Sequence, residues 1–528
     1  MKARTLFFNA RIYTQAFGLV VDSLAVCGHR VIAVGNRLEQ DPDFKAYAKV
    51  DLGGRTIVPG LVDAHAHFYY FALSLGRVSL DGLESLEACL EKIRTFSRQC
   101  RKSEWVLGDG YSPDRFTRRV EPDRYVLDAV TGGRPAFIFS KDQHSVWVNS
   151  RALEIAGIGK DTRDPAGGKI DRLADGTPSG IFREQAAYDP VLACIDPPSP
   201  QTVQRRYRQA LQHAYRKGVT AVHSFDGPDG FAFFNDLALK GRLGLRINYY
   251  PAARLLPELR RTGTRYGCGD DFLRIAGVKV FADGSLGSQT ALCFDPYIGT
   301  GGDRGIEATS VADMKKIIRS AARLGLPCAI HAIGDKAVAN VLDAFEMNVA
   351  LPAGARHRIE HLQLLWRRDI SRIRRLKVVA SMQPSHCPSD MHMIRKYWGK
   401  RGANAFIFRT LIDRGVDLAF GSDAPIELLD PMAGIAAAAR RARPGSRDVF
   451  YPDQRIKASE ALYRFTVGPA VACGQEHCRG YLLPGYPADL VVLSQDITRV
   501  APTRIRDTEV LATILDGRVV YCHSSLAL

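Results

Sequence analysis

Two histidines that flank a single alanine, in the segment VPGLVDAHAH, are the first residues able to do chemistry. Side chains two apart on a strand share a face, so His65 and His67 are predicted to point the same way. Two neutral imidazoles side by side are a natural pair of zinc ligands. The pair alone is equally compatible with two polar surface histidines, so the prediction needs support from the rest of the chain.

That support comes from three further side chains able to ligate a metal, each in a strand-like segment. His331 lies near the end of LPCAIHAIG, His361 lies in HRIEHLQ, and Asp423 follows the apolar run of LAFGSDAP. A (β/α)₈ barrel collects catalytic groups from several strand ends at one rim. The five residues together therefore predict a metal site, with a buried structural role as the alternative for any single histidine.

Lys279 lies between two valines in the strand-like segment AGVKVFADG. A lysine inside a buried strand must lose the hydration of its cation, which is costly. The amine is therefore expected to be neutral, or paired with a carboxylate, or converted by carbon dioxide into a carbamate. A carbamate is anionic and offers two oxygens, so it could bridge two metal ions.

The elements that must position these residues are strands alternating with helices. The chain contains eight short apolar strand candidates, most of them separated by helical stretches: IVPGLVDAHAH, GVTAVHSF, LRINYYP, IAGVKVFADG, LPCAIHAIG, HRIEHLQ, VVASMQP and LAFGSDAP. This alternation indicates a parallel α/β sheet, and eight units fit a closed (β/α)₈ TIM-type barrel. The alternative, an open doubly wound sheet, has a G-x-G-x-x-G fingerprint that follows no strand candidate here.

The two ends of the chain and one long interval lie outside this pattern. Both ends are β-rich, so we expect a small β-sandwich domain formed by both termini, residues 1–58 plus 480–528, beside a barrel at 59–479. A βα loop needs only about 2–6 residues, whereas the first and second strand candidates are separated by a long, polar, turn-rich interval. This interval predicts an inserted subdomain at about 70–216, rising over the barrel's catalytic face.

Composition limits the classes of function. The chain has 528 residues, 46% hydrophobic and 24% charged, which excludes a disordered or fibrous protein. The formal charge of +16 comes from basic residues that are dispersed and mixed with acids, so no nucleic-acid partner is expected. No apolar run is long enough for a membrane span, so no membrane partner is expected either. The 11 scattered cysteines are typical of reduced thiols in a cytoplasmic protein.

Several motifs in combination resemble the metal-dependent amidohydrolase superfamily, and more narrowly its long branch that contains N-substituted formamide deformylase. They are VPGLVDAHAH, GVKVFADGSLGSQTA, IHAIGDKAV, RIEHLQ, LAFGSDAP, KDQHSVWVNSRAL, ASEALYRFTVGPAVACG and GYPADLVVLSQDI. The resemblance covers essentially the whole chain. It implies a (β/α)₈ barrel with a terminal β-sandwich and hydrolysis at a metal centre, typically zinc, with one or two ions. The implied ligands are His65, His67, Lys279 as a bridging lysine, His331, His361 and Asp423.

The expected mechanism follows from charge. Bound Zn²⁺ lowers the pKa of water from about 15.7 toward 7. Asp423 is expected to accept the proton of that water and to pass it to the leaving amine. His144, in the branch motif DQHSVWVN, is predicted to hydrogen-bond the substrate carbonyl and stabilise the oxyanion, with a structural histidine of the insertion as the alternative.

The remaining candidates are substrate-binding residues. Trp147 could wall an apolar pocket, although a buried core tryptophan fits its context equally well. Four further residues are substrate-binding or supporting candidates: Asp109, Glu184, Asp283 and His386. His223, in TAVHSF, is interpreted as a satisfied core histidine, with substrate contact as its alternative.

The sequence thus predicts a metal-dependent hydrolase of carbon–nitrogen bonds other than peptide bonds, acting on an N-substituted amide or formamide. A deaminase of a cyclic imine or amidine, with one metal and an unmodified Lys279, is the alternative within the same barrel. A non-catalytic scaffold on a hydrolase-like barrel is the alternative from another class, disfavoured because all six candidate ligands are present. A small-molecule substrate is the expected partner, and a homo-oligomer is compatible with the sequence.

Overall fold

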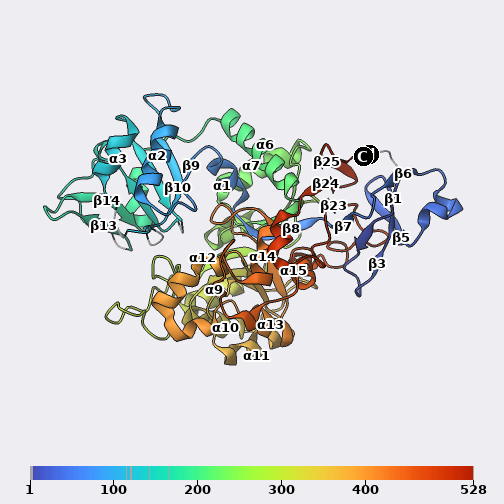
Figure 1. Cartoon of the computed structure of the whole chain (residues 1–528). Helices are drawn as coiled ribbons and strands as arrows, with labels where there is room; N and C mark the ends of the chain where they lie inside the picture. Colours follow the sequence, from blue (N-terminus) through green and yellow to red (C-terminus); the bar gives the residue numbers. More distant parts are fainter. Residues whose placement is uncertain (1–3, 114–115, 119–121, 142, 166, 527–528) are drawn as a thin grey trace. The chain divides into compact units, whose positions relative to one another are not determined.

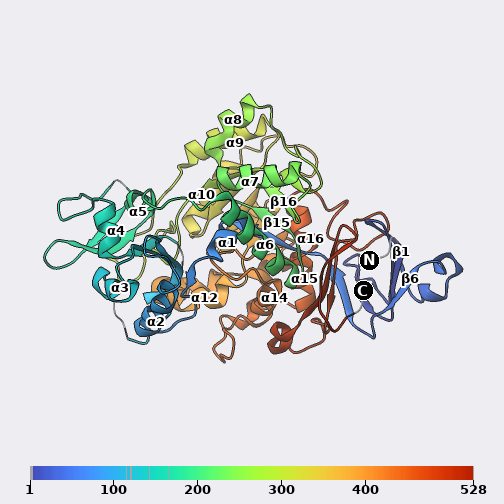
Figure 2. The same ribbon diagram turned by 90° about the horizontal axis from the view of Figure 1, so that it is seen from above.

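The computed structural model describes residues 4–113, 116–118, 122–141, 143–165 and 167–526. The chain forms two compact units, the first made of residues 1–70 with 210–528 and the second of residues 71–209 (Figures 1 and 2). The second unit covers nearly the same residues as the predicted insertion at about 70–216. The domain boundaries at 58, 59, 479 and 480 stay predictions.

The first unit contains two parallel sheets, one in the order β17-β16-β15-β8 and one in the order β18-β19-β20-β21-β22. Every pair of neighbouring strands in them is parallel. The two sheets hold nine strands, and each of the eight strand candidates contains one of them; the ninth is β17, of which the candidates include only Ile275. Their bounds are β8 Leu61–Ala66, β15 Val219–Ser224, β16 Arg246–Tyr249, β17 Leu273–Ile275, β18 Val278–Phe281, β19 Cys328–Ala332, β20 Arg358–His361, β21 Val379–Met382 and β22 Leu418–Phe420.

Isolated parallel bridges link the two sheets at both sides. Ala66, at the end of β8, pairs with Ala424 just beyond β22, and Ala252, just beyond β16, pairs with Lys279 in β18. The first strand therefore lies beside the last one, and the strands follow one another in chain order. Their residues are almost all buried, as expected for parallel strands with helices on the outer face.

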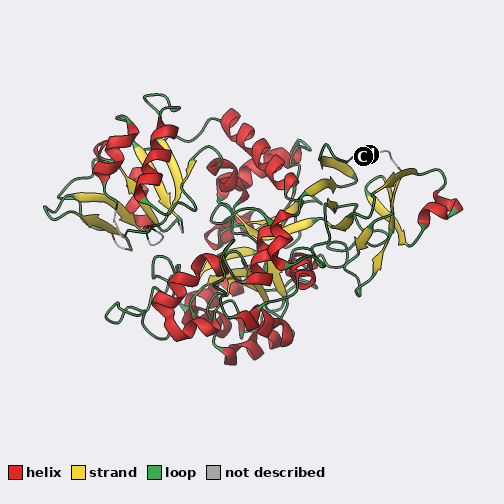
Figure 3. Ribbon diagram, in the orientation of Figure 1, coloured by secondary structure: helices red, strands yellow, loops and turns green. Residues whose placement is uncertain are grey.

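Helices, red in Figure 3, lie between these strands along the chain, except that only residues 276 and 277 separate β17 from β18. Amphipathic α9 shows the reason, because Met314, Ile318 and Ala321 recur at helical spacing and are buried while its charged residues face outward. The helices of this unit, with the two that cross into the insertion, are α1 Phe68–Ser74, α6 Pro200–Arg216, α7 Pro228–Leu239, α8 Leu256–Arg261, α9 Val311–Ala322, α10 Asp335–Phe345, α11 Ile370–Arg375, α12 His386–Met393, α13 Phe408–Asp413, α14 Pro431–Arg440, α15 Ala458–Arg464 and α16 Val467–Ala472.

The two ends of the chain meet in a six-stranded sheet of order β25-β24-β23-β7-β2-β3 (Figure 2, blue and dark red strands). A four-stranded sheet, β5-β4-β1-β6, accompanies it, and one hydrophobic cluster takes residues from both ends of the chain. The strands are β1 Arg4–Phe8, β2 Arg11–Tyr13, β3 Val20–Val21, β4 Ser23–Cys27, β5 Arg30–Gly35, β6 Ala48–Asp51, β7 Thr56–Pro59, β23 Leu490–Leu493, β24 Val510–Leu515 and β25 Arg518–Cys522.

The second unit is a six-stranded mixed sheet of order β13-β14-β12-β11-β10-β9 with helices on both faces. Residues of α2 and α3 pack on one face, and residues of α4 and α5 pack on the other. The bounds are β9 Val78–Ser79, α2 Leu86–Ser97, β10 Val106–Tyr111, α3 Arg124–Thr131, β11 Ala136–Ser140, β12 Ser145–Val148, α4 Ser150–Ile155, β13 Lys169–Arg172, β14 Pro178–Arg183 and α5 Gln185–Leu192. Its core is thus separate from that of the first unit.

Arg246, at the start of β16, joins the parallel strands to the terminal sheet. Its guanidinium donates to both carboxylate oxygens of Asp489, at 2.7 and 3.1 Å, and to Asp516 at 3.0 Å. The side chains of Arg246 and Asp489 are 4% and 14% exposed, so their ion pair is largely shielded from water, whereas the Asp516 side chain is 32% exposed. Within the described residues, none of the helices is both long and apolar enough to cross a bilayer.

We expect Arg246→Met to destabilise the protein by about 3–5 kcal/mol, because it leaves two carboxylates without their buried partner. The measurement is the midpoint of thermal unfolding, since a chain of this size need not unfold in one step. Arg261→Met is the matched control, because the Arg261–Glu258 pair lies at the surface and its loss should not move the midpoint. Equal midpoints for the two variants would contradict the role given to Arg246.

Candidate metal and catalytic site

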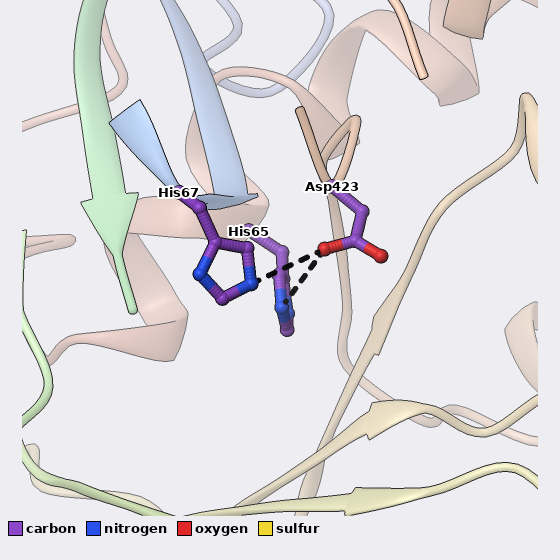
Figure 4. A group of neighbouring side chains, drawn as sticks. All are labelled: His65, His67 and Asp423. Atoms are coloured by element: carbon purple, nitrogen blue, oxygen red, sulfur yellow. Dashed lines mark ion pairs between the residues drawn. The ribbon is translucent and has the colours of Figure 1, made fainter. Parts of the chain in front are cut away.

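Two histidines and an aspartate meet where β8 ends beside the segment that follows β22. The Oδ1 atom of Asp423 lies 3.4 Å from Nε2 of His65 and 3.6 Å from Nε2 of His67 (Figure 4). One ligand atom from each of the three residues lies within 4.8 Å of the other two. The structure therefore brings together three of the six predicted ligands in an arrangement that could hold a metal ion.

A second group shares the same aspartate. His361 at the end of β20, His386 at the start of α12 and Asp423 also have ligand atoms within 4.8 Å of one another. Nε2 of His386 lies 3.8 Å from Oδ2 of Asp423. The sequence indicated His386 only as a substrate-binding candidate, whereas the structure places it where a ligand could be. Its position just after β21 was the one signal available in the sequence.

His331 and Lys279 lie beside these groups. The ring of His331 is 4.5 Å from that of His361, and its Nε2 lies 3.0 Å from the carbonyl oxygen of Gly284. Nζ of Lys279 lies 4.6 Å from the ring centre of Phe225 and 4.9 Å from that of Phe281. Among the described residues it makes no hydrogen bond or ion pair, so the predicted pairing with a carboxylate is not seen.

Burial sets the charge of these groups. Burial, together with the positive charge of Lys279, lowers the pKa of His67 to about 3 and that of His65 well below its ordinary value. Burial likewise lowers the pKa of Lys279 to about 8 and raises that of Asp423 to about 6. His65 and His67 are therefore neutral at pH 7, which is the form in which imidazole binds a metal.

Three ring nitrogens in the site have no hydrogen-bond partner among the described residues: Nε2 of His65, Nδ1 of His361 and Nε2 of His386. A buried polar atom without a partner costs about 1–3 kcal/mol, so such atoms are rare unless something binds them. Neutral imidazoles and one carboxylate are also the donor set that Zn²⁺ prefers. The residues present thus fit a divalent metal ion.

A buried carboxylate fixes the orientation of His65. The Nδ1–H of His65 donates to Oε2 of Glu360 at 2.6 Å, and both side chains have no exposed surface. Arg358, also fully buried, donates to both oxygens of Glu360 at 2.6 and 3.1 Å. His65 is thereby left with Nε2 facing Asp423. The sequence analysis missed Glu360, although it lies in the RIEHLQ motif.

His223 belongs to the same buried network. Its Nδ1 accepts a hydrogen bond from Arg358 at 2.7 Å, and the residue is 1% exposed. The guanidinium also donates to the hydroxyl of Tyr250 at 3.2 Å. His223 thus has the contacts of a core histidine whose hydrogen bonding is satisfied, which is the role that the sequence favours.

The local backbone explains how neighbouring residues reach one site. Side chains adjacent on a regular strand point to opposite faces, yet Glu360 and His361 both contact His65. His361 has a φ of 71° and Asp423 a φ of 63°, values that L-residues rarely adopt and that cluster at functional sites. This departure from strand geometry turns their side chains toward the site.

Gly421 and Asp63 hold the end of β22 against β8. Asp63 accepts backbone hydrogen bonds from Ser422 at 2.9 Å and from His65 at 3.1 Å. A Cβ atom on Gly421 would lie 2.4 Å from the His65 nitrogen, so only glycine permits this approach. The approach is what brings Asp423 beside the two histidines.

Asp283 has the contacts of a supporting residue, which is one of its two predicted roles. Its carboxylate accepts backbone N–H groups of Ile333 at 3.0 Å, Gly334 at 2.8 Å and Leu292 at 2.9 Å, and the residue is 2% exposed. These contacts occupy both oxygens. Asp283 therefore positions the turn that follows His331 instead of contacting substrate.

Trp147, in the second unit, was predicted either to wall an apolar pocket or to be a buried core residue, and its surroundings favour the core role. The indole has no exposed surface, lies in a hydrophobic cluster with α2 and α3, and donates to the Asp123 carbonyl oxygen at 2.8 Å. It is a core residue of the insertion, which was the alternative. Asp109 is paired with Arg77 at 2.9 Å.

His144 and Glu184 form a pair within the second unit. Nδ1 of His144 lies 3.0 Å from Oε2 of Glu184, and both side chains are partly buried. Glu184 has a φ of 65°, and its Oε1 is buried with no partner among the described residues. Sequence reasoning named both residues separately but not their contact, because they lie 40 positions apart. Their roles toward substrate stay predictions.

Several known proteins are similar to this chain over nearly its whole length. YtcJ of Bacillus subtilis (strain 168), which is named as an amidohydrolase, is 30% identical over 92% of each chain. N-substituted formamide deformylase of Arthrobacter pascens is 27% identical over 98% of each chain. The crystal structure of an uncharacterized metal-dependent hydrolase from Pyrococcus furiosus is 30% identical, with a TM-score of 0.75, and covers 94% of this chain and 100% of that one.

The family model described as "Amidohydrolase family" matches residues 48–521, which is most of the chain. With the structural likeness, it implies a TIM-barrel-type fold for the alternating strands and helices. The histidine and aspartate groups at the strand ends fit the metal dependence of the Pyrococcus furiosus protein. The chain therefore belongs to the amidohydrolase family, and it is a hydrolase that acts on carbon–nitrogen bonds other than peptide bonds.

Proposed function

We propose that the enzyme hydrolyses an N-substituted amide or formamide and releases an amine. The observation that carries this proposal is the group of imidazoles with buried, unpartnered nitrogens around the carboxylate of Asp423. The whole-length likeness to a formamide deformylase supports the choice of substrate class. We also infer that the two parallel sheets close into one eight-stranded barrel, in which β17 and β18, separated by only two residues, count as one interrupted strand; the bridges at both sides of the sheets support this.

Zinc is the proposed metal, as one or two ions. His65, His67 and Asp423 would hold one ion, and Lys279 as a carbamate, His331 and His361 would complete a site for two. His386, close to Asp423, is a further ligand candidate from the structure. When bound, the metal supplies a Lewis acid that polarises the substrate carbonyl and makes water a nucleophile near pH 7.

Asp423 is proposed to carry the proton during the reaction. Its carboxylate has one oxygen facing His65 and His67 and the other facing His386. It accepts a proton from the attacking water, whose oxygen bonds to the carbonyl carbon. When the tetrahedral intermediate collapses, the carbon–nitrogen bond breaks and the proton passes from Asp423 to the departing amine nitrogen.

His144 is proposed to stabilise the negative charge that develops on the substrate oxygen. Its Nδ1–H donates to Glu184, which fixes the orientation of the ring. When the ring carries a proton on both nitrogens, its Nε2–H donates to the carbonyl oxygen as charge develops on it. Glu184 would then be a positioning residue.

One observation favours a second candidate, the mononuclear deaminase of a cyclic imine or amidine. Lys279 lies against the faces of Phe225 and Phe281 with no carboxylate partner, an environment that suits an unmodified amine. Such an enzyme would need only the ion held by His65, His67 and Asp423.

Asp423→Asn should reduce turnover at least about 10³-fold, because an amide cannot accept the proton of water. The assay measures amine and formate release from a panel of N-substituted formamides and amides by the zinc-loaded enzyme. The zinc content of both proteins is measured alongside. Asp453→Asn changes an exposed aspartate in the same way and should leave turnover unchanged. Full activity in Asp423→Asn would overturn the mechanism.

Metal content and the state of Lys279 separate the two candidates. The two-ion form of the amidohydrolase proposal predicts two metal ions per chain and one carbamate carbon, seen by ¹³C NMR after exchange with ¹³C-labelled bicarbonate. Both the carbamate signal and one metal ion should disappear in Lys279→Met. One ion per chain and no carbamate carbon would overturn the two-ion form and would agree with the deaminase.

Glu360→Gln should weaken zinc binding about 10–100-fold, because the neutral amide holds the His65 ring less firmly. Competition with a chromophoric chelator measures the affinity. Glu346→Gln is the control, since Glu346 pairs with surface arginines. The unfolding midpoint of the metal-free proteins shows whether the fold is kept. An unchanged affinity in Glu360→Gln, with the fold intact, would refute this role.

A further inference from the structure

Phe281, the last residue of β18, is an exposed aromatic residue at the edge of the candidate site. The three residues before it in β18 are buried, whereas Phe281 is 49% exposed. Single apolar side chains scattered over a protein surface are normal and need no explanation. Phe281 differs from these because of the side chains that its ring contacts.

Two contacts fix the direction of the Phe281 side chain. Phe281 lies two positions after Lys279, so both side chains lie on one face of β18, and Nζ of Lys279 is 4.9 Å from the Phe281 ring centre. In the parallel pairing of β18 with β19, Phe281 is aligned with His331, and their ring centres are 5.2 Å apart. Phe281 therefore shares a face with two predicted metal ligands and follows them toward the carboxyl end of the strands.

Phe281 also ends a row of aromatic and imidazole rings that runs through the candidate site. Neighbouring ring centres in this row are 4.5–6.3 Å apart, and the rings, in order, are those of Tyr70, His67, His65, His361, His331 and Phe281. The four histidines are predicted ligands, and the two end residues, Tyr70 and Phe281, are 42% and 49% exposed. The row thus presents an accessible aromatic ring at each end.

The two end rings differ in what they offer to a substrate. The hydroxyl of Tyr70 is polar and is hydrogen-bonded to the backbone of Gly227. The side chain of Phe281 has no polar atom, so its exposed part is stabilised only by contact with another apolar group. Because the ring adjoins His331, a substituent of a few carbon atoms on a substrate held at the histidines is enough to reach it.

We propose that Phe281 is a specificity-determining residue that selects substrates with an apolar group on the amide nitrogen. The exposed part of its ring contacts that group while the carbonyl carbon lies at the histidines and Asp423. A polar atom in the same place would lose hydration against the ring without gaining a hydrogen bond, so it is disfavoured. This inference rests on the proposed function, because it names the group that the released amine carries.

The test compares two formamides of equal length, N-butylformamide and N-(3-hydroxypropyl)formamide, which end in a methyl and a hydroxyl group. Formate release by the zinc-loaded enzyme gives kcat and KM for each. We expect kcat/KM of the unaltered enzyme to favour the butyl compound at least about tenfold. Phe281→Asn should reduce this preference to less than about threefold by raising KM for the butyl compound, with kcat for the hydroxypropyl compound within about twofold.

Two further substitutions and a control make the result specific to the ring. Phe281→Leu keeps an apolar side chain and should retain most of the preference. Phe281→Ala should lower the preference and serves as the second variant if Phe281→Asn disturbs folding. Leu239→Ala is the matched control, because Leu239 is 82% exposed and ends α7, a helix that runs back from the carboxyl end of β15. Zinc content and the unfolding midpoint are measured for every variant.

The outcomes separate this inference from the function on which it rests. If the unaltered enzyme hydrolyses both formamides equally well, or if Phe281→Asn and Phe281→Ala keep its preference, the inference alone is wrong. If neither formamide is hydrolysed, and neither are the corresponding acetamides, the proposed function is wrong and the inference fails with it.

Discussion

The buried ion pair between Arg358 and Glu360 is the interaction on which the site depends. Both side chains have no exposed surface, so two charges are held where hydration is lost. Such a pair is tolerated only when its remaining hydrogen-bonding groups are satisfied. Here the guanidinium also donates to the Ala64 carbonyl oxygen at 2.6 Å and to the Ser381 hydroxyl at 2.7 Å. Burial alone would lower the pKa of Arg358, but the Glu360 carboxylate outweighs it, so the pKa is raised. One guanidinium thereby ties β8, β15, β20 and β21 together and orients His65 through Glu360.

Much of this arrangement was predictable from the sequence because it follows strand periodicity. His65 and His67 are two apart and share a face, and metal-competent residues recur in separate strand candidates. The strands formed where those candidates lie. The partnership of Glu360 with His65 was not predictable, because alternation assigns Glu360 and His361 to opposite faces. Glu360 and His361 both reach His65 because the backbone at His361 is left-handed. The residue type at that position does not predict this conformation.

The insertion is a second example of what the sequence could and could not predict. Its existence followed from the length and polarity of the interval between two strand candidates. The roles of its residues did not follow, because they depend on contacts between distant positions. Trp147 packs in the hydrophobic cluster on one face of the insertion's sheet, and this packing cannot be read from the sequence. His144 contacts Glu184 because β12 pairs with β14. Sequence motifs therefore identified individual residues of interest. Only the folded structure shows which residues they contact.

The pairing of the two chain ends in one sheet has a consequence for synthesis. β7 ends at Pro59 and its antiparallel partner β23 begins at Leu490, which is 490 − 59 = 431 positions later. At about 5–20 residues per second, a ribosome needs roughly 20–90 s to cover that distance. During this time one edge of β7 has no partner, and the apolar residues around it await the C-terminal strands. An unpaired edge is a template for pairing with other chains. The N-terminal strands of this sheet therefore stay open to chaperones and to aggregation until β23 is made, and any stop before Leu490 leaves them so.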